Sequence, residues 1–537
     1  MKKYTIKSFV YTTALSLLFA TGCTDLDTPV VSEITPDNFP KTAEDFIAVA
    51  GPIYARISAD YMLSYWFNQE CSADGMVLTA NGGNWYDAGR YADQHYHSWK
   101  KDERFVGEAW RMCFNGISKC NSVLQLFEAA EETSAKKTAI AEIRAMRALN
   151  YFMVTDLYGD VPLVTTFGTG TETGPRVSRA TISDFIESEL KEVLPDLSGT
   201  TGITTYGRPT KWMAYALLAK LYLNAPVYTG KSRNDDVVAM CDQIITEANT
   251  NGKIALDADY LKMFYPTNGP SVTDFLFAVV YDSNNMKYNY PARYWLNKMQ
   301  KTQFGVLPFT PAGAMKTWPE FYAKFTIDAT DVRQKMWLTG KQYMASDGVT
   351  PVSVVTTKKG LDSRYTGTDG SAKVTYQLEF TPNIEFRNLA TFDTGDDYIG
   401  LAVGYRCNKF YPDVNSATRD QSNDVPVFRY ADVLLMKAEA ILRGASPTMG
   451  QTALSLVNMV RARSKASLFT SIDLDGLLDE RARELCFECW RRNDLIRFGK
   501  WEDKWGVKTD ADVRHRVFPI PSTEIDLNPE MTQNPGY

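Results

Sequence analysis

The chain has 537 residues, of which 44% are hydrophobic and 23% are charged, a balance typical of globular proteins with a large buried core. This composition excludes a mostly disordered chain and a collagen-like chain. The formal net charge is −6, and no run of Lys or Arg supplies a basic surface. Because phosphate binding needs a net basic face, nucleic acid is excluded as a partner. Aromatic residues make up 12% of the chain, with 11 Trp and 29 Tyr, so some are expected at a surface that binds a flat, amphipathic ligand.

The first 22 residues have the pattern of a secretory signal peptide. Three lysines within residues 2–7 form a basic start, and residues 9–20 are apolar but fall short of the ~20 residues that span a bilayer. Residues 18–23, Leu-Phe-Ala-Thr-Gly-Cys, resemble a bacterial lipobox, in which the cysteine receives diacylglycerol before cleavage. The usual leucine three residues before the cysteine is Ala20 here. Cys23 is therefore predicted to be lipidated and to become the first residue of an exported, membrane-anchored chain.

A polar stretch with several prolines, residues 23–40, is predicted to be a tether that leads from the lipid to the folded body. Thr42 then precedes an acidic turn and apolar residues at helical spacing, which predicts a capped helix. The following helices come in pairs joined by short loops, similar to the stacking units of tetratricopeptide repeats, although no 34-residue period is evident. These helices are predicted at residues 104–130, 134–157, 181–195, 210–225 and 234–249.

Between residues 250 and 425 the sequence changes to scattered Gly, Pro, Asn, Thr and aromatic residues. This pattern predicts a loop-rich insertion with short strands at 354–357 and 374–380, separated by turns between Gly360 and Gly370. Beyond it, helices are predicted at residues 425–442, 450–465 and 474–498. A proline-rich tail, residues 518–537, is expected to pack against the body.

These patterns predict a mainly α chain with a signal peptide at 1–22, a lipid-anchored tether at 23–40 and a single domain at 41–537. Within the domain we expect three parts. They are a helical part at 41–250, a loop-rich variable part at 251–424 and a second helical part at 425–537.

The cysteines and histidines do not indicate a metal site. Apart from Cys23, seven cysteines remain, an odd number without the spacing of a disulfide framework. Cys486 and Cys489 form a CxxC pair, but the pair lies in a predicted helix without a second CxxC or a nearby His, so buried free thiols are expected. His95 and His97 lack an evident third ligand and are expected in a packed loop.

Several blocks of the sequence resemble signatures of the SusD/RagB family of outer-membrane lipoproteins that bind nutrients. They follow the order of the family, span about residues 45 to 537 and stand behind the lipobox. The blocks are Ala145–Phe152 with Asp156–Val164, Arg429–Ala440, Val460–Arg463, Glu480–Glu488 with Arg491–Lys500, Phe518–Pro521 and Gln533–Tyr537.

The resemblance implies a fold of four tetratricopeptide-like helix pairs that support an irregular, loop-rich ligand face. It also implies a lipoprotein that is anchored at the outer membrane and exposed at the cell surface. Such a protein captures oligosaccharides and delivers them to a SusC-like TonB-dependent transporter. Because reversible capture needs no catalytic residue, metal or cofactor, the chain is expected not to be an enzyme. Whether a structural calcium ion supports the loops is open at this point.

Three glutamates of the predicted 474–498 helix, Glu480, Glu484 and Glu488, recur every four residues and are expected on one face. Paired carboxylates can act as general acid and base, but each of these has an arginine within a turn. Ion pairing that locks helix to helix is therefore the favoured interpretation. We expect Arg144 or Arg147 of the 134–157 helix to reach this acidic face.

The segment 74–99 has the pattern of a sugar-binding loop. Its glycines allow sharp turns, and its aromatic residues offer rings for the apolar C–H faces of sugars, while Asp, Asn and Arg can bond the hydroxyls. The predicted ligand-binding residues are Asp74, Asn81, Trp85, Tyr86, Asp87, Arg90 and Trp99 in this segment, with Trp295 and Trp318 in the loop-rich part. The segment resembles a loop in the starch-binding branch of the family, but an arginine expected near Ala80 is absent. Starch itself is therefore in doubt as the ligand.

Two other functions compete with glycan capture. A surface glycoside hydrolase would need two carboxyl groups about 5 to 9.5 Å apart in one cleft, and Asp74 with Asp87 is the only suspected pair. A peptide-binding uptake lipoprotein is the second alternative, since some relatives in this family serve peptide uptake. The sequence names neither the glycan and its linkage nor the transporter.

Overall fold

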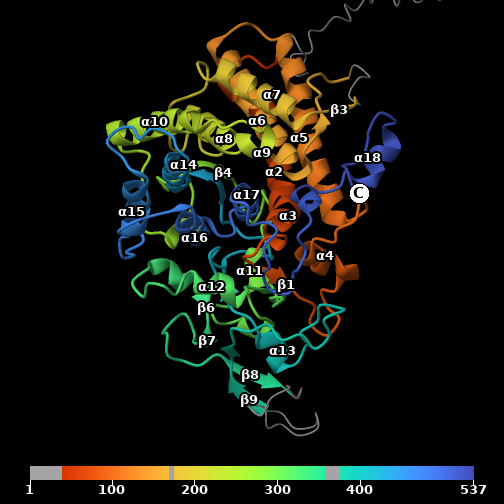
Figure 1. The fold of residues 1–537 in the computed structure, drawn as a ribbon, viewed down its shortest axis with the longest axis vertical. Coiled ribbons are helices and arrows are strands. Elements are labelled where there is room, and N and C mark those ends of the chain that lie inside the picture. The colour runs from red at the N-terminus through yellow and green to blue at the C-terminus, as the bar shows by residue number, and fades with distance from the viewer. Residues whose placement is uncertain (1–38, 169–173, 357–373) are drawn as a thin grey trace, which may run out of the picture.

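The computed structural model describes residues 39–168, 174–356 and 374–537 (Figure 1). The predicted signal peptide, Cys23 and nearly all of the tether lie outside these residues, as do the turns expected between Gly360 and Gly370. Helices dominate, and every sheet of the described chain has two strands. The predicted mainly α fold is confirmed. No described helix is both long enough and apolar enough to cross a membrane.

The long helices of the first helical part, α2, α5, α6, α7, α8 and α10, lie in the upper half of Figure 1. The first of them, α2, begins with the predicted cap: Thr42 accepts a hydrogen bond from the Asp45 amide, and the Asp45 side chain accepts one from the Thr42 amide. Neighbours along the chain pack against each other, as α5 with α6 and α8 with α10 do. The helices are α2 (Ala43–Asp60), a π-helical turn (Tyr61–Tyr65), α3 (Trp66–Cys71), α4 (Arg90–Tyr96), α5 (Arg104–Glu128), α6 (Ser134–Tyr158), α7 (Arg179–Val193), α8 (Lys211–Leu223), α9 (Ala225–Tyr228) and α10 (Asn234–Asn251).

The second helical part packs onto the first through α14, which contacts both α8 and α10. Its helices are α14 (Tyr430–Leu442), α15 (Ala453–Arg463), α16 (Leu474–Leu485), α17 (Arg491–Arg497) and α18 (Ser522–Leu527). The helix predicted from residue 425 is wrong at its start, because Val425–Arg429 forms strand β12. This strand pairs antiparallel with β4 (Phe275–Val279), a partner that lies far away in the sequence.

The helix predicted over residues 474–498 is broken into α16 and α17. Phe487 and Cys489 have φ values of 62° and 67°, which no α-helix accommodates. Their backbone groups bond to α3 instead: Trp66 donates its indole N–H to the Phe487 carbonyl at 2.9 Å, and Glu70 accepts from the Cys489 amide at 2.6 Å. Tertiary hydrogen bonds therefore replace the helical ones at this break.

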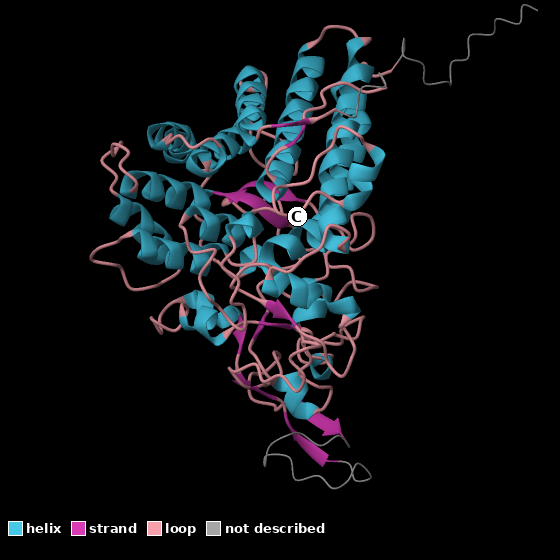
Figure 2. Cartoon of the chain, turned by 45° about the vertical axis from the view of Figure 1, so that its right-hand side comes forward, coloured by secondary structure: helices cyan, strands magenta, loops and turns pink. Residues whose placement is uncertain are grey.

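The loop-rich part fills the lower half of Figure 2, where short strands alternate with long loops. The predicted strands are confirmed: β8 (Ser353–Thr356) pairs with β9 (Val374–Gln377). The other pairs are β1 (Val77–Leu78) with β5 (Met315–Lys316), β2 (Val161–Pro162) with β3 (Arg176–Val177), β6 (Trp337–Leu338) with β11 (Arg406–Cys407), and β7 (Gly340–Lys341) with β10 (Glu379–Phe380). Three short helices belong to this part: α11 (Pro291–Trp295), α12 (Pro319–Ala323) and α13 (Tyr398–Ala402).

The C-terminal tail packs against the helical body, as predicted. The Phe518 amide donates to the Leu157 carbonyl at 2.8 Å, and the Asn534 side chain donates to the Tyr158 carbonyl at 2.8 Å. At the last residue, the Tyr537 hydroxyl accepts from the Trp99 indole at 2.8 Å. The tail therefore closes over the end of α6.

A buried cluster of charges, here called the ionic core, joins α16 to the rest of the molecule. It consists of Glu480, Glu484 and Glu488 with the cations that bond to them: Arg333, Lys409, Arg429, Arg461, Arg463 and Arg483. Burial by itself would raise the pKa of Glu480, but the neighbouring guanidinium groups hold that pKa below its ordinary value. Ion pairing at the three glutamates is thus confirmed.

The partner predicted for this acidic face is wrong. Arg144 and Arg147 each bond to Glu189 of α7 at 2.6 Å, because α6 packs directly beside α7. Arginines from later segments of the chain neutralise the three glutamates instead.

The seven cysteines of the described residues are buried, and so are His95 and His97, which lie in α4 and at its C-terminal cap and not in the packed loop that was expected. Cys486 and Cys489 are buried free thiols, as expected. His95 and His97 are fully buried, and this burial lowers the pKa of each, to about 4 for His97. Among the described residues, no group of three or more His, Cys, Asp or Glu side chains is arranged to hold a metal ion.

Candidate ligand-binding site

The loop between β1 and α4 is held in a strained backbone conformation. Trp85, Asp87 and Ala88 have φ values of 68°, 47° and 59°, the left-handed region that residues with a side chain rarely adopt. Each such residue costs about 1–2 kcal/mol, so the surrounding contacts must hold the loop in place. Strain of this kind concentrates at binding and catalytic sites.

A carboxylate from a distant loop holds the start of this segment. Asp393 accepts hydrogen bonds from the amides of Gly82 at 2.8 Å, Gly83 at 2.7 Å and Gly395 at 2.6 Å. Partial burial would raise the pKa of Asp393, but these amides favour the charged form and hold the pKa below its ordinary value. The loop is therefore fixed before any ligand arrives.

Trp85 differs from every other tryptophan of the chain. All eleven lie in the described residues, and the other ten are at most 8% exposed, whereas Trp85 is half-buried. Its ring meets Tyr294 edge-to-face, with centroids 5.4 Å apart and planes at 88°. The Arg293 guanidinium lies 5.4 Å from the Trp85 ring centroid. Packing against α11 thus orients the indole without covering it fully.

A groove of about 460 Å³ opens beside this indole and is called the Trp85 groove below. The loop-rich part meets the β1–α4 loop here, near α4, β1 and α11 in Figure 1. The residues that line it are Asn81, Asn84, Trp85, Asp87, Arg293, Lys298, Thr310, Pro311, Ala312 and Leu401. An aromatic ring and several donors and acceptors therefore face one cavity.

The structure brings five of the predicted ligand-binding residues to this region. Asn81, Trp85 and Asp87 line the groove, and Tyr86 is 40% exposed on the same loop. Arg90 begins α4 and donates its Nε proton to the Asp87 carbonyl at 3.1 Å. Arg90 therefore supports the loop and does not line the groove.

The other four predicted residues lie elsewhere. Trp99, Trp295 and Trp318 are at most 4% exposed, and their rings pack against core groups: Trp99 on Phe518, Trp295 on Phe487 and Trp318 on His95. Asp74 is buried and accepts two hydrogen bonds of 2.7 Å from the Arg491 guanidinium. These side chains present no ring face or free oxygen to a ligand in the Trp85 groove.

Asp74 lines a separate, strongly charged cleft of about 330 Å³. Its acids and bases are largely paired with each other, as Lys324 is with Asp479 at 2.6 Å and Lys500 with Asp475 at 3.1 Å. Asp74 and Asp87 therefore face different cavities and do not form the carboxylate pair that a glycoside hydrolase needs.

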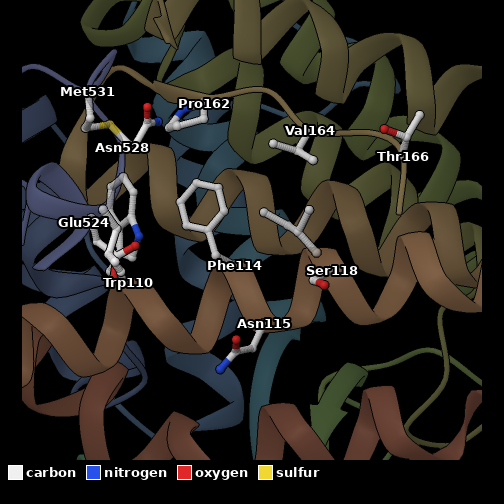
Figure 3. Close-up of a pocket in the computed structure, with 12 residues that line it drawn as sticks. Trp110, Phe114, Asn115, Ser118, Pro162, Val164, Thr166, Glu524, Asn528 and Met531 are labelled. Atoms are coloured by element: carbon white, nitrogen blue, oxygen red, sulfur yellow. The ribbon is translucent and has the colours of Figure 1, made fainter. Parts of the chain in front are cut away.

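A third cavity, of about 280 Å³, lies between α5 and the C-terminal segment (Figure 3). Figure 3 shows Trp110 and Phe114 projecting from α5 beneath Pro162 and Val164, with Met531 at one end. Its lining is mostly apolar, and Glu524 is its only charged residue. Its polar lining residues are Asn115, Ser118, Thr166, Glu524 and Asn528, and none of them was predicted to bind a ligand.

Sequence reasoning missed the far wall of the groove. Arg293, Lys298, Thr310 and Pro311 all line it, yet no motif marks them. The sequence offers one indirect signal: Arg293 lies two residues before Trp295, a predicted ligand-binding residue. The pairing of β1 with β5 brings the two regions together.

Comparison with known proteins gives a consistent result. Residues 229–537 match the family model described as "SusD family", and residues 38–223 match one described as "Starch-binding associating with outer membrane". The starch-binding protein SusD of Bacteroides thetaiotaomicron is 26% identical over 431 residues, which cover 74% of this chain and 72% of that protein.

Solved structures share the fold. A SusD superfamily protein from Parabacteroides distasonis has a TM-score of 0.70 and 22% identity, covering 94% of this chain and all of that one. Surface glycan-binding protein A from Bacteroides thetaiotaomicron, solved in complex with laminarihexaose, has a TM-score of 0.65 and 20% identity, covering 91% of this chain and 99% of that one. Since a family model matches more than half of its length, this chain belongs to the SusD family.

Proposed function

We propose that this chain is a lipid-anchored protein of the outer-membrane surface that captures an oligosaccharide in the Trp85 groove. It then delivers the oligosaccharide, without cleaving it, to a SusC-like TonB-dependent transporter. One observation carries the proposal: the only tryptophan that is not buried lies in a groove lined by carboxylate, amide, hydroxyl and cationic side chains.

The groove has the chemistry that sugars require. The apolar C–H face of a sugar ring can lie on the Trp85 indole, with Tyr86 at the edge of the groove. Asp87 can accept hydrogen bonds from hydroxyls, and Asn84 and Arg293 can donate to them. Because Asp393 fixes the loop in advance, little ordering entropy is lost on binding.

The printed names of relatives support a glycan ligand. One relative is a starch-binding protein, and a solved structure with a TM-score of 0.66 and 20% identity is a laminarin-binding SusD-like protein. The family model that matches residues 38–223 is described as associating with the outer membrane, which supports the predicted location. We propose that residues 41–537 act as one body behind a tether lipidated at Cys23.

Capture without hydrolysis is favoured by the arrangement of the acids. Asp87 is the only carboxylate among the described residues that line the Trp85 groove, and Asp74 is engaged by Arg491 in another cleft. A glycoside hydrolase needs two carboxyl groups across one scissile bond. Reversible binding needs neither a nucleophile nor a metal-bound water.

Calorimetric titration of the unlipidated chain, residues 24–537, against plant, host and microbial glycans tests the proposal. We expect one glycan class to bind and no new reducing ends to form in the same tubes. Tyr86→Ala should weaken binding, while Phe167→Ala, which removes an aromatic ring of similar exposure on the helical part, should not. Sustained release of reducing ends would favour the hydrolase. Absence of binding to every glycan would favour a peptide ligand.

A further inference from the structure

Arg293 lacks the acidic partner that most partly buried arginines of this protein have. Its guanidinium lies 5.4 Å from the Trp85 ring centroid and 5.9 Å from that of Tyr294. In the part of the chain that the structure describes, no carboxylate forms an ion pair with it and no backbone carbonyl accepts from its side chain. Two rings and a hydrogen bond to Tyr294 thus orient the cation, but no carboxylate of the described chain neutralises it.

Two fully buried arginines of the fold have bonding partners that can be compared with those of Arg293. Arg429 bonds to Asp274, Glu484 and Glu488. Arg406, buried without an acid, donates to the carbonyls of Leu401, Val403 and Gly404. Most guanidinium nitrogens of these two buried arginines are thus bonded within the protein, whereas half-buried Arg293 forms no ion pair in the described chain.

Among the residues that line the Trp85 groove, cationic side chains are more numerous than acidic ones, although the chain as a whole is acidic. Arg293 and Lys298 line the groove, and Asp87 is the only acid among its described lining residues, so cations outnumber acids there. The whole chain carries a net charge of −6. An anionic ligand is repelled by the protein at long range, so a local excess of cations is what its capture would need.

We propose that the Trp85 groove selects glycans that carry anionic groups, and that the Arg293 guanidinium binds the anion while the sugar ring lies on Trp85. This inference rests on the proposed function. A guanidinium matches the paired oxygens of a carboxylate or a sulfate, and its two bonds to them are charge-assisted. The anionic group is therefore a uronate carboxylate or a sulfate ester.

Two matched pairs of ligands test the proposal on the unlipidated chain. The first is an oligogalacturonate with its carboxyl-reduced, neutral counterpart, and the second is a sulfated galactan with its desulfated counterpart. We expect one anionic member to bind about tenfold or more tighter than its neutral partner, which corresponds to at least 1.4 kcal/mol. The pair that shows the preference identifies the anion. This affinity should fall as salt is raised.

Arg293→Gln keeps an amide donor for sugar hydroxyls but removes the charge, so it should abolish the preference, and the neutral ligand should lose much less affinity than the anionic one. Arg111→Gln, which removes an exposed arginine of α5, is the matched control and should retain the preference. Arg293→Lys should retain part of it, because the charge stays but the paired donors are lost.

Neutral glycans that bind as tightly as the anionic ones, with Arg293→Gln acting on both alike, would overturn the anionic preference and leave glycan capture standing. Absence of binding by every member of both pairs and of the wider panel would overturn both proposals together.

Discussion

The ionic core and the Trp85 groove both bring charged side chains next to aromatic rings, but they treat charge in opposite ways. In the ionic core, Glu484 is fully buried and bonds to Arg333, Arg429 and Arg463. In the groove, Arg293 is oriented by two rings and has no acidic partner in the described chain. Ion-paired side chains stabilise the fold in the ionic core, whereas the guanidinium without an ion pair lies in the groove that we propose binds the ligand.

The difference follows from the cost of burying a charge. Deep in the protein an unpaired ion is very unfavourable, so every glutamate of the ionic core has a cation within bonding distance. At a half-exposed position water still screens the charge, and the cost of leaving it unpaired is small. The groove can therefore contain an arginine without an ion pair, which could bind an anion. The buried ionic core could not contain such an arginine.

The largest expected effect comes from breaking the ionic core. Arg429→Met leaves Glu484, Glu488 and Asp274 with less neutralisation, and it should lower the free energy of unfolding by about 3–5 kcal/mol. The matched change Arg293→Met should cost only about 1 kcal/mol, since it removes ring contacts and a hydrogen bond to Tyr294 at a half-buried position. Urea unfolding measures both. Equal losses would contradict the distinction between the two regions.

Glu70 is an exception at the edge of the ionic core. One of its oxygens accepts from the Cys489 amide, the other is buried without a partner, and burial raises the pKa of Glu70 to about 8. The folded state thus binds more protons than the unfolded state, whose pKa is near the ordinary 4.5, so stability falls as pH rises from about 4.5 through 8.

Glu70→Gln removes this dependence. The variant should differ least from wild type at pH 5, where Glu70 is protonated in the folded protein. Toward pH 9 the free energy of unfolding of the variant should rise relative to that of wild type, by on the order of 1.4 kcal/mol for each unit by which the folded and unfolded pKa values of Glu70 differ. Urea unfolding at the two pH values measures the gain. Parallel pH profiles for the two proteins would show that Glu70 has an ordinary pKa.

A smaller effect is expected where the fold holds the groove loop. Asp393→Ala removes the acceptor for the Gly82 and Gly83 amides and should cost about 1–2 kcal/mol of stability. It should also weaken glycan binding by about fivefold, or on the order of 1 kcal/mol, because the loop must then be ordered by the ligand. Asp347→Ala is the control: Asp347 accepts from the amides of Val349 and Thr350 in another loop. That variant should bind glycan as wild type does.

The smallest effect tests the strain in the loop. Ala88→Gly relieves a left-handed residue, a gain of about 1–2 kcal/mol that the entropy of glycine offsets by about 0.5–1 kcal/mol. The variant should therefore be more stable than wild type by about 1 kcal/mol or less and bind glycan slightly more weakly. A loss of stability would mean that the Ala88 conformation is unstrained.

Local sequence patterns predicted much of the fold. They failed where contacts between residues far apart in the sequence determine the secondary structure. Periodic runs located helices such as α5 and α6 to within one or two residues. Val425–Arg429 looked helical because its preference for a strand comes from pairing with β4. The break before α17 depends on hydrogen bonds from α3, and no residue nearby in the sequence indicates it.

The site was predictable in one half only. Glycines and aromatic residues marked the loop that carries Trp85, because unusual turns leave a trace in composition. The local sequence does not show whether a tryptophan is buried. Buried Trp295 and Trp318 could therefore not be distinguished from half-buried Trp85 by sequence. Arg293 went unnoticed because its importance lies in the absence of an acidic partner, which only the packed structure reveals.

The central claim is that the Trp85 groove binds glycan while the helical parts hold the fold. Trp85→Ala tests it most directly, with unfolding and calorimetric titration measured on the same preparation. We predict that the variant unfolds within about 1–2 kcal/mol of wild type, because the side chain is only half-buried, and that its Kd for the bound glycan rises by about tenfold or more. A variant that binds that glycan as tightly as wild type would contradict the account.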